Sequence, residues 1–383
     1  MKKQNLRIVV KIGSSSLTNE THGCDPEKMK NLVKAIARLC KDGHEVLLVS
    51  SGAVASGYTR LGYKSRPKTL IAKQAAAAVG QSILMQQYTD MFAEQEMGVA
   101  QILLTRTDFT NHERYRHAFQ TISLLLFRGV LPIINENDTV SAAELSFGDN
   151  DMLGVLVAGL IHANLYIMLT DTNGLYESDP RKDPNARHIP FIQEVTSETI
   201  ALAGKAGSLG TGGMRSKLMA AQTAGNVGIS SYIGTLTDED CLVRIVKGLG
   251  GGTYIGAPAP DIQPQEKTLP NRKQWIAFHS PVRGKISVDE GAADAVLRQK
   301  RSLLPAGIRQ IEGSFEAGDV VEVYQDHRLI GRGVSRFTSE ELAAFLNTHK
   351  NHALPGEVIH RDYWTVINQS AFDREKTQTI KER

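Results

Sequence analysis

Residues 8–16 read Ile8-Val9-Val10-Lys11-Ile12-Gly13-Ser14-Ser15-Ser16, an apolar run that ends in a lysine and a glycine–serine turn. The apolar start predicts a strand that is buried on both faces, as in a parallel sheet. Gly13 allows the backbone to turn close to a ligand, and the serines after it offer hydroxyl and N–H donors to an anion. Lys11 at the end of such a strand either contacts that anion or simply leaves the core for solvent.

Similar β-rich runs alternate with helix-length segments over roughly the first 255 residues. The expected strands are Arg7–Lys11, Glu45–Ser50, Ala100–Leu104, Leu131–Asn135, Leu165–Leu169 and Ile229–Ile233, and the expected helices include Pro26–Lys41, Ile71–Glu96, Ala118–Phe127 and Met214–Gly225. This alternation predicts an α/β fold with a mostly parallel sheet covered by helices on both faces. Ligands bind at the carboxyl ends of the strands in such sheets, where Lys11, Ser50-Ser51-Gly52, Asn135–Asp138 and Thr170-Asp171 are expected to lie.

The second part of the chain has a different character. Gly248–Thr253 and the proline-bearing Ala257–Pro270 indicate an exit from the first domain and a linker. Short β-type runs follow, with one helix expected over Gly291–Arg301. We therefore expect a first domain over residues 1–258, a linker over 259–274, a small β-rich domain over 275–362 and a charged tail over 363–383.

Composition narrows the class of protein. The 383 residues suit two domains, and 41% hydrophobic with 22% charged residues is ordinary globular composition. Net charge is 44 minus 41, or +3, so no overall field draws the chain to nucleic acid or membrane. Three scattered cysteines argue against a disulfide framework or a zinc site and indicate the cytoplasm. No stretch has the length and apolarity of a signal peptide, so the start is expected to be mature protein.

A second lysine follows another glycine-rich stretch, Gly207-Ser208-Leu209-Gly210-Thr211-Gly212-Gly213-Met214-Arg215-Ser216-Lys217. Apolar residues after it recur at helical spacing, so Lys217 is expected in the first turn or so of a helix. A cation opposes the helix dipole there, which favours a contact with phosphate. The spacing is neither that of a P-loop nor that of a G-x-G-x-x-G dinucleotide motif.

Acid and amide groups are concentrated between the two lysines, in Asn135-Glu136-Asn137-Asp138 and Asp149-Asn150-Asp151. Both segments adjoin apolar runs, so we expect them to border the sheet rather than form a solvated acidic loop. Some of these groups would hold a substrate amine, and one would orient the lysines. Two lysines, glycine turns and acidic groups are what phosphoryl transfer requires, and they predict a small-molecule kinase.

Two further segments keep two interpretations each. Ser50-Ser51-Gly52-Ala53 lies between a strand and a helix, so its N–H groups suit a carboxylate or phosphate, and its serines suit plain N-capping. Thr170-Asp171 follows the strand Leu165–Leu169 and either caps a helix or contacts a nucleotide. A metal, if used, would be Mg²⁺ that arrives with the nucleotide phosphates.

The motifs together resemble those of the bacterial glutamate 5-kinase (γ-glutamyl kinase) family, in the amino acid kinase superfamily. They are Lys11–Ser15, Ser50–Ala53, Ile134–Asp138, Gly148–Asp151, Leu169–Asp171, Gly174–Tyr176, Asp179–Arg181 and Gly210–Met214. Residues 284–292 and 302–308 resemble the PUA domain that many of these enzymes carry. The resemblance runs from Ile8 to about His360.

The resemblance implies a three-layer αβα kinase domain that phosphorylates the γ-carboxylate of L-glutamate with ATP, the first step of proline biosynthesis. Lys11 and Lys217 would neutralise the transferred phosphoryl group, and Asp151 would hold both lysines. Glutamate would be bound by Ser51, Gly52, Ala53, Asp138, Asp149 and Asn150. ATP, with its Mg²⁺, would be bound by Lys11, Thr170, Asp171, Thr211, Gly212, Gly213, Met214, Arg215, Ser216 and Lys217.

The resemblance also implies feedback inhibition by L-proline and a homo-oligomer, either dimer or tetramer. Arg114-Tyr115-Arg116-His117-Ala118 departs from the family pattern, in which leucine and asparagine replace Arg116 and His117. Another superfamily member with a different substrate is the main rival within kinases. RNA binding by the PUA domain stays open, although acidic residues interleave with its basic ones.

Overall fold

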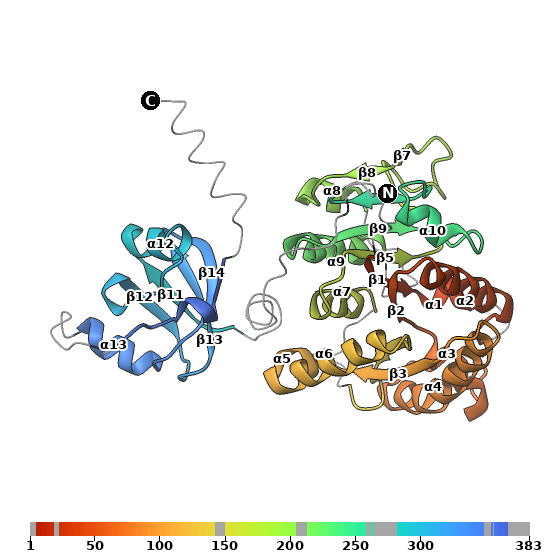
Figure 1. Cartoon of the computed structure of the whole chain (residues 1–383), viewed down its shortest axis with the longest axis horizontal. Coiled ribbons are helices and arrows are strands. Elements are labelled where there is room, and N and C mark those ends of the chain that lie inside the picture. The colour runs from red at the N-terminus through yellow and green to blue at the C-terminus, as the bar shows by residue number, and fades with distance from the viewer. Residues whose placement is uncertain are drawn as a thin grey trace. The chain divides into compact units, whose positions relative to one another are not determined.

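The computed structural model describes residues 5–18, 23–141, 150–203, 213–257, 262, 282–347, 354 and 356–366. They form two compact units, each considered by itself (Figure 1). The first unit contains an eight-stranded sheet and the second a five-stranded sheet. Apart from residue 262, the expected linker over 259–274 lies outside the described residues, as do residues 367–383 of the expected tail.

The large sheet is mostly parallel, as predicted. Its strands lie in the order β3 (Val99–Leu104), β4 (Leu131–Glu136), β2 (Glu45–Val49), β1 (Arg7–Ile12), β5 (Leu165–Leu169), β9 (Ser230–Gly234), β10 (Thr253–Ile255) and β8 (Phe191–Ile192). Neighbours from β3 to β9 are parallel, whereas β10 is antiparallel to β9 and parallel to β8. The central strands are fully buried, which explains why they are continuous apolar runs.

Helices cover both faces of this sheet, which confirms the three-layer expectation. The helices of the unit are α1 (Ser14–Leu17), α2 (Pro26–Lys41), α3 (Ala53–Gly57), α4 (Leu70–Ala93), α5 (Arg106–Thr110), α6 (His112–Phe127), α7 (Asn150–Leu160), α8 (Ser197–Leu202), α9 (Met214–Asn226) and α10 (Cys241–Val246), with a 3-10 turn at Tyr58–Leu61. The strands β6 (Leu175–Tyr176) and β7 (His188–Ile189) form a separate two-stranded antiparallel sheet.

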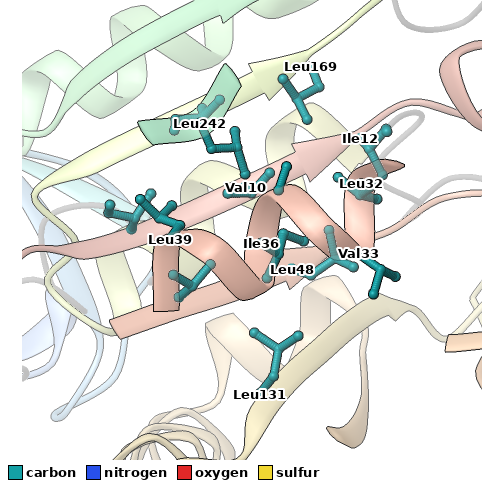
Figure 2. Close-up of a cluster of buried hydrophobic side chains, with 14 of the residues drawn as sticks. Val10, Ile12, Leu32, Val33, Ile36, Leu39, Leu48, Leu131, Leu169 and Leu242 are labelled. Carbon is teal, nitrogen blue, oxygen red and sulfur yellow. The ribbon is translucent and has the colours of Figure 1, made fainter. Parts of the chain in front are cut away.

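One apolar cluster shows which way β1 faces. Val10 and Ile12 of β1 pack with Leu48 of β2 against Leu32 and Ile36 of α2 (Figure 2). Side chains alternate between the two faces along a strand, so Lys11 points to the opposite face. There α7 contacts β1, β2, β4 and β5, and α9 contacts β5 and β9. The pleat of β1 therefore sends the lysine toward α7 and α9.

Element boundaries differ from the predictions mainly where local signals are weak. The residues of α2 match the prediction, because Asp25 caps its N-terminus by accepting hydrogen bonds from the Glu27 and Lys28 N–H groups. Helix α6 begins at His112 rather than residue 118, since the Asn111 side chain accepts from Glu113 and Arg114 N–H and starts the helix earlier.

The segment Gly248–Thr253, expected as the exit from the first domain, is followed by one more strand of the large sheet, because its last residue begins β10. Tyr254 of β10 pairs with Tyr232 of β9, and their rings meet edge to face with centroids 4.8 Å apart. Tertiary packing of this kind stabilises a strand that is too short to be marked by its own sequence.

The second unit is β-rich, as predicted. Its elements are β11 (Val282–Val288), α12 (Glu290–Leu297), β12 (Ile308–Gly313), β13 (Val320–Gln325), β14 (Arg328–Val334), α13 (Ser339–Asn347) and β15 (Trp364–Val366), with 3-10 turns at Pro305–Gly307 and Arg361–Tyr363. The strand order is β12-β11-β13-β14-β15, and the pairing of β11 with β13 alone is parallel among the described strands of this sheet. Within the described parts of the chain, no helix is long and apolar enough to cross a membrane.

Candidate active site

The carboxyl ends of four strands meet at one edge of the large sheet. Lys11 of β1 is in register with Val49 of β2 on one side and with Met168 of β5 on the other. Ile134 of β4 is in register with Val49. The polar segments that follow these strands therefore begin at nearly the same level, and residues far apart in the chain become neighbours.

Two lysines share one carboxylate at this edge. Lys11 Nζ donates to Asp151 Oδ1, and Lys217 Nζ donates to Asp151 Oδ2 over 2.9 Å. All three residues are buried, with exposed fractions of 3%, 4% and 0% for Lys11, Lys217 and Asp151. The three side chains come from β1, α9 and α7, so this cluster exists only in the folded chain.

The charge of Asp151 is maintained by its partners. Burial alone would raise the pKa of this carboxyl, but the charges of Lys11 and Lys217, and the hydrogen bonds from both, hold the pKa below its ordinary value. Asp151 also lies in the first turn of α7, where a negative charge is favourable. With Asp151 ionised and both lysines protonated, the cluster carries a net positive charge in a buried place, which suits a phosphoryl group.

The start of α7 is tied to the ends of β2 and β4 through Asn150. Its Nδ2 donates to Ser50 O over 2.7 Å, to Ser51 Oγ over 3.0 Å and to Asn135 Oδ1 over 2.9 Å. Asn135 in turn donates through Nδ2 to Gln81 Oε1 of α4 over 2.9 Å. Asn150 and Ser51, both expected to bind glutamate, are therefore direct neighbours.

The turn between β2 and α3 depends on a glycine. Gly52 has φ +110°, in the left-handed region, and a side chain there would meet Cys24 Sγ. Gly52 is the N-cap of α3, and no side chain caps this helix. The interpretation of the two serines as N-caps of the helix was therefore wrong. Ser50 instead shares a hydrogen bond of 2.8 Å with the buried Tyr88 hydroxyl of α4. Ala53 is buried at the start of α3.

Asp138 lies just beyond β4 and is half-buried. Burial and the nearby charge of Glu136 raise its pKa to about 6, against a smaller opposite effect of Arg66. Glu136 is itself buried and accepts a hydrogen bond of 2.7 Å from Ser141 Oγ. Two carboxyls placed together in this way favour a cation between or beside them, such as an ammonium group.

Two described segments that are expected to bind nucleotide adjoin the elements that carry the lysines: Thr170-Asp171 follows β5, the neighbour of β1, and residues 213–217 begin α9. Thr170 N–H donates to Gly234 O over 2.9 Å, and Asp171 accepts from Arg181 Nη2 over 3.2 Å. No helix begins at Thr170-Asp171, because bends lead from there into β6, so the helix-cap interpretation was wrong. Gly213 is the N-cap of α9 and offers no side-chain cap to its first N–H groups.

The remaining α9 residues differ in burial. Met214 and Ser216 are half-buried, Arg215 is exposed, and Lys217 is buried in the first turn, where its N–H donates to Gly213 O over 3.3 Å. Asp149, Thr211 and Gly212 lie outside the described residues. In the segment that departs from the family pattern, Tyr115 is buried and Arg116 and His117 are exposed on α6.

Two site residues were missed as such from the sequence. Asn135 was noted within an acid and amide run, but its bridging position between Asn150 and Gln81 was not predicted. Gln81 lies inside α4, and glutamine in a long helix carries no signal of its own. Among the described residues, no group of three or more His, Cys, Asp or Glu side chains could hold a metal ion.

The chain is similar to known proteins over nearly its whole length. The amino acid kinase family model matches residues 6–235, and the PUA domain model matches residues 284–353. Glutamate 5-kinase 1 of Bacillus licheniformis is 53% identical over 373 residues, which covers 96% of this chain and 100% of that protein. Glutamate 5-kinase 1 of Bacillus subtilis is 50% identical over 371 residues, with the same two coverages of 96% and 100%.

A solved structure adds support for the fold alone. The carbamate kinase from Giardia lamblia bound to AMP-PNP matches with a TM-score of 0.50 and 17% sequence identity, over 66% of this chain and 99% of that one. The match covers about as much of the chain as the unit with the large sheet.

Proposed function

The chain belongs to the amino acid kinase family, and from this premise we propose that it transfers the γ-phosphoryl group of ATP to the γ-carboxylate of L-glutamate. The product is γ-glutamyl phosphate, at the first step of proline biosynthesis. Relatives named glutamate 5-kinase that align with 96% of the chain support the choice of substrate. The buried cluster of Lys11, Lys217 and Asp151 is the observation that supports phosphoryl transfer.

The reaction needs little from the protein except charge and position. A carboxylate nucleophile is already ionised at neutral pH, so no general base is required. Negative charge on the transferred group is spread over its oxygens in the transition state, and fixed cations stabilise it without reorganisation. Lys11 and Lys217 supply these cations. Asp151 holds the two ammonium groups at fixed places between substrate and nucleotide.

Glutamate has three charged groups, and the site offers a partner of matching chemistry to each. Ionised Asp138 binds the α-ammonium group. Ser51 and the N–H groups of Gly52 and Ala53 bind the carboxylates. Asn150 Oδ1 is a second acceptor for the ammonium group, because Asn150 Nδ2 already donates to protein oxygens. Asp149, which adjoins Asn150 in the sequence, is proposed as a further glutamate contact.

ATP fits the side of the site formed by β5 and α9. The first N–H groups of α9 and its positive helix dipole suit phosphate oxygens, because Gly213 provides no side-chain cap for them. We assign Thr170, Asp171 and the stretch from Thr211 to Lys217 to the nucleotide. Mg²⁺ would come with the ATP phosphates and neutralise part of their charge, and it would be held mainly by phosphate and water oxygens.

Regulation and assembly are part of the proposal. We propose L-proline as a feedback inhibitor and a dimer or tetramer as the working form, to be tested by proline titration and by light scattering. The unpaired thiols of Cys24, Cys40 and Cys241 support a cytoplasmic location. RNA binding by the second unit is not favoured, since Lys285 and Arg298 pair with Glu312 and Asp294.

The test is ADP release from Mg-ATP with L-glutamate, with L-aspartate, N-acetyl-L-glutamate and UMP as control acceptors. We expect turnover with L-glutamate and none of comparable rate with the controls. Turnover with one control only would leave a kinase with another substrate. Turnover with none would contradict the proposal.

A further inference from the structure

We propose that Gln81 of α4 is a positioning residue for the glutamate site, because it orients the amide of Asn135 and, through it, the amide of Asn150. This inference rests on the proposed function. Gln81 lies in the interior of a 24-residue helix and 54 positions before Asn135. No motif marks it, and its connection to the site is visible only in the fold.

The amide of Asn135 is held at both ends. Its Oδ1 accepts from Asn150 Nδ2 and from Glu136 N–H, each over 2.9 Å. Its Nδ2 donates to Gln81 Oε1, also over 2.9 Å. Asn135 is 3% exposed, so water cannot easily replace a lost partner. Gln81 provides the acceptor that keeps the NH₂ end of Asn135 turned away from Asn150.

The orientation of Asn135 determines that of Asn150. An asparagine amide has a donor end and an acceptor end, and the network of partners decides which end faces where. The Nδ2 of Asn150 faces three oxygens, Ser50 O, Ser51 Oγ and Asn135 Oδ1. Its Oδ1 is therefore at the other end of the amide group and can accept an N–H of the substrate ammonium. If Asn135 rotated, two NH₂ groups would face each other, and this arrangement of Asn150 would lose its support.

A purely structural role for Gln81 makes a different prediction. The residue is half-buried on a helix that packs against α3 through other residues, Gly80 among them. If Gln81 only stabilised α4, its loss would lower the melting temperature and leave the affinity for glutamate unchanged. If Gln81 orients the amides of Asn135 and Asn150, its loss raises KM for glutamate more than it lowers kcat. The effect then depends on the presence of Asn135.

The experiment compares Gln81→Met with Gln86→Met. Methionine keeps the length and helix propensity of glutamine but provides no comparable acceptor. Gln86 is an exposed residue of the same helix whose side chain bonds to Asp90, so it is a matched control. We expect Gln81→Met to raise KM for L-glutamate by roughly 3- to 10-fold, the range of one lost hydrogen bond, with KM for ATP and kcat changed by less than about 2-fold.

A double-mutant cycle tests whether the effect of Gln81 on KM is transmitted through Asn135 or is independent of it. In an Asn135→Ala background, Gln81→Met should cause no further rise in KM, because its partner is absent. An equal rise in both backgrounds, or an unchanged KM in the single variant, would overturn the inference while leaving the kinase assignment intact. If Gln81→Met does not fold, Gln81→Asn, which is too short to reach Asn135, takes its place. Wild-type protein without glutamate-dependent turnover would overturn the proposed function, and this inference with it.

Discussion

Lys11 and Asp151 stand 140 positions apart in the chain and form a buried ion pair at the carboxyl edge of the large sheet. The same carboxylate binds Lys217, 66 positions further on. Removing Asp151 leaves two buried ammonium groups without a counter-charge, whereas removing one lysine leaves a neutral pair and takes a cation from the site. The cluster therefore has consequences for both stability and catalysis.

Lys217→Ala should lower kcat for glutamate phosphorylation by roughly 10²- to 10³-fold, the usual effect of removing one preorganised donor. KM for L-glutamate should change little, because the glutamate groups lie on the side of Asn150 and Asp138. ADP release at saturating Mg-ATP is the measurement. Lys34→Ala, which removes a half-buried lysine paired with Glu239 away from the cluster, serves as control and should keep wild-type kcat. A kcat within a few-fold of wild type would contradict the role of Lys217.

Asp151→Asn should lower the free energy of unfolding by about 3–5 kcal/mol at pH 7, because two buried ammonium groups lose their carboxylate. The pKa of Asp151 in the folded protein is below its ordinary value. Its stabilising effect is therefore present above the unfolded pKa of about 4, and is lost as the pH falls through the folded pKa.

Urea unfolding followed by circular dichroism between pH 3 and pH 7 can test this. The gap in stability between wild type and Asp151→Asn should narrow toward the acid end. Asp294→Asn removes a surface carboxylate paired with Arg298 and should cost less than about 1 kcal/mol. A similar small loss for Asp151→Asn would show that the cluster has no special stability.

Asp138 should make glutamate binding pH-dependent. Its pKa is raised to about 6, so the ionised form that pairs with the α-ammonium is lost as the pH falls below 6. We expect kcat/KM for L-glutamate to decline toward tenfold per pH unit well below this value, whereas kcat at saturating glutamate is less affected. The Asp138→Asn variant should have a low kcat/KM for L-glutamate at all pH values and should not show this decline at acid pH. A wild-type profile that is flat between pH 5 and pH 7 would be incompatible with the assignment.

The raised pKa of Asp138 favours glutamate binding at higher pH, but it makes the folded protein less stable at higher pH. Between the unfolded pKa of about 4 and the folded value of about 6, the folded protein binds more protons than the unfolded chain does. The contribution of Asp138 to the free energy of unfolding therefore falls as the pH rises through this window. Asp138→Asn should consequently raise the melting temperature of the ligand-free protein at pH 8.

Gly80→Ala should destabilise the protein, although alanine is ordinarily the better helix former by about 1 kcal/mol. A Cβ at Gly80 would overlap the backbone of Ala53 and Gly57, where α3 crosses α4, and backbone cannot yield as a flexible side chain can. We expect a loss of about 1–3 kcal/mol. Gly225→Ala in α9, where the added Cβ meets nothing within 4 Å, should be neutral or stabilising in the same thermal unfolding assay.

Much of the fold could be predicted because burial and sequence pattern coincide in this chain. The predicted strand Leu165–Leu169 matches β5, and the other central strands differ by about one residue at an end, because strands buried on both faces are continuous apolar runs. Helix α2 matches over its whole length, since Asp25 and Pro26 mark its start. Short strands such as β10 were missed, because their stability comes from neighbours rather than from their own residues.

The sequence by itself determined the class of fold, the polar residues at the strand ends and, through the resemblance, the family. The tertiary structure brings Lys11 and Lys217 together on Asp151, a contact that the resemblance implied, and only the tertiary structure shows that Gln81 reaches Asn135. Local propensity and side-chain alternation depend on residues a few positions apart, and so they can be recognised in the sequence. Contacts across 54 to 140 positions depend on the order of strands and on how helices cross the sheet, which only the packing of the whole unit settles.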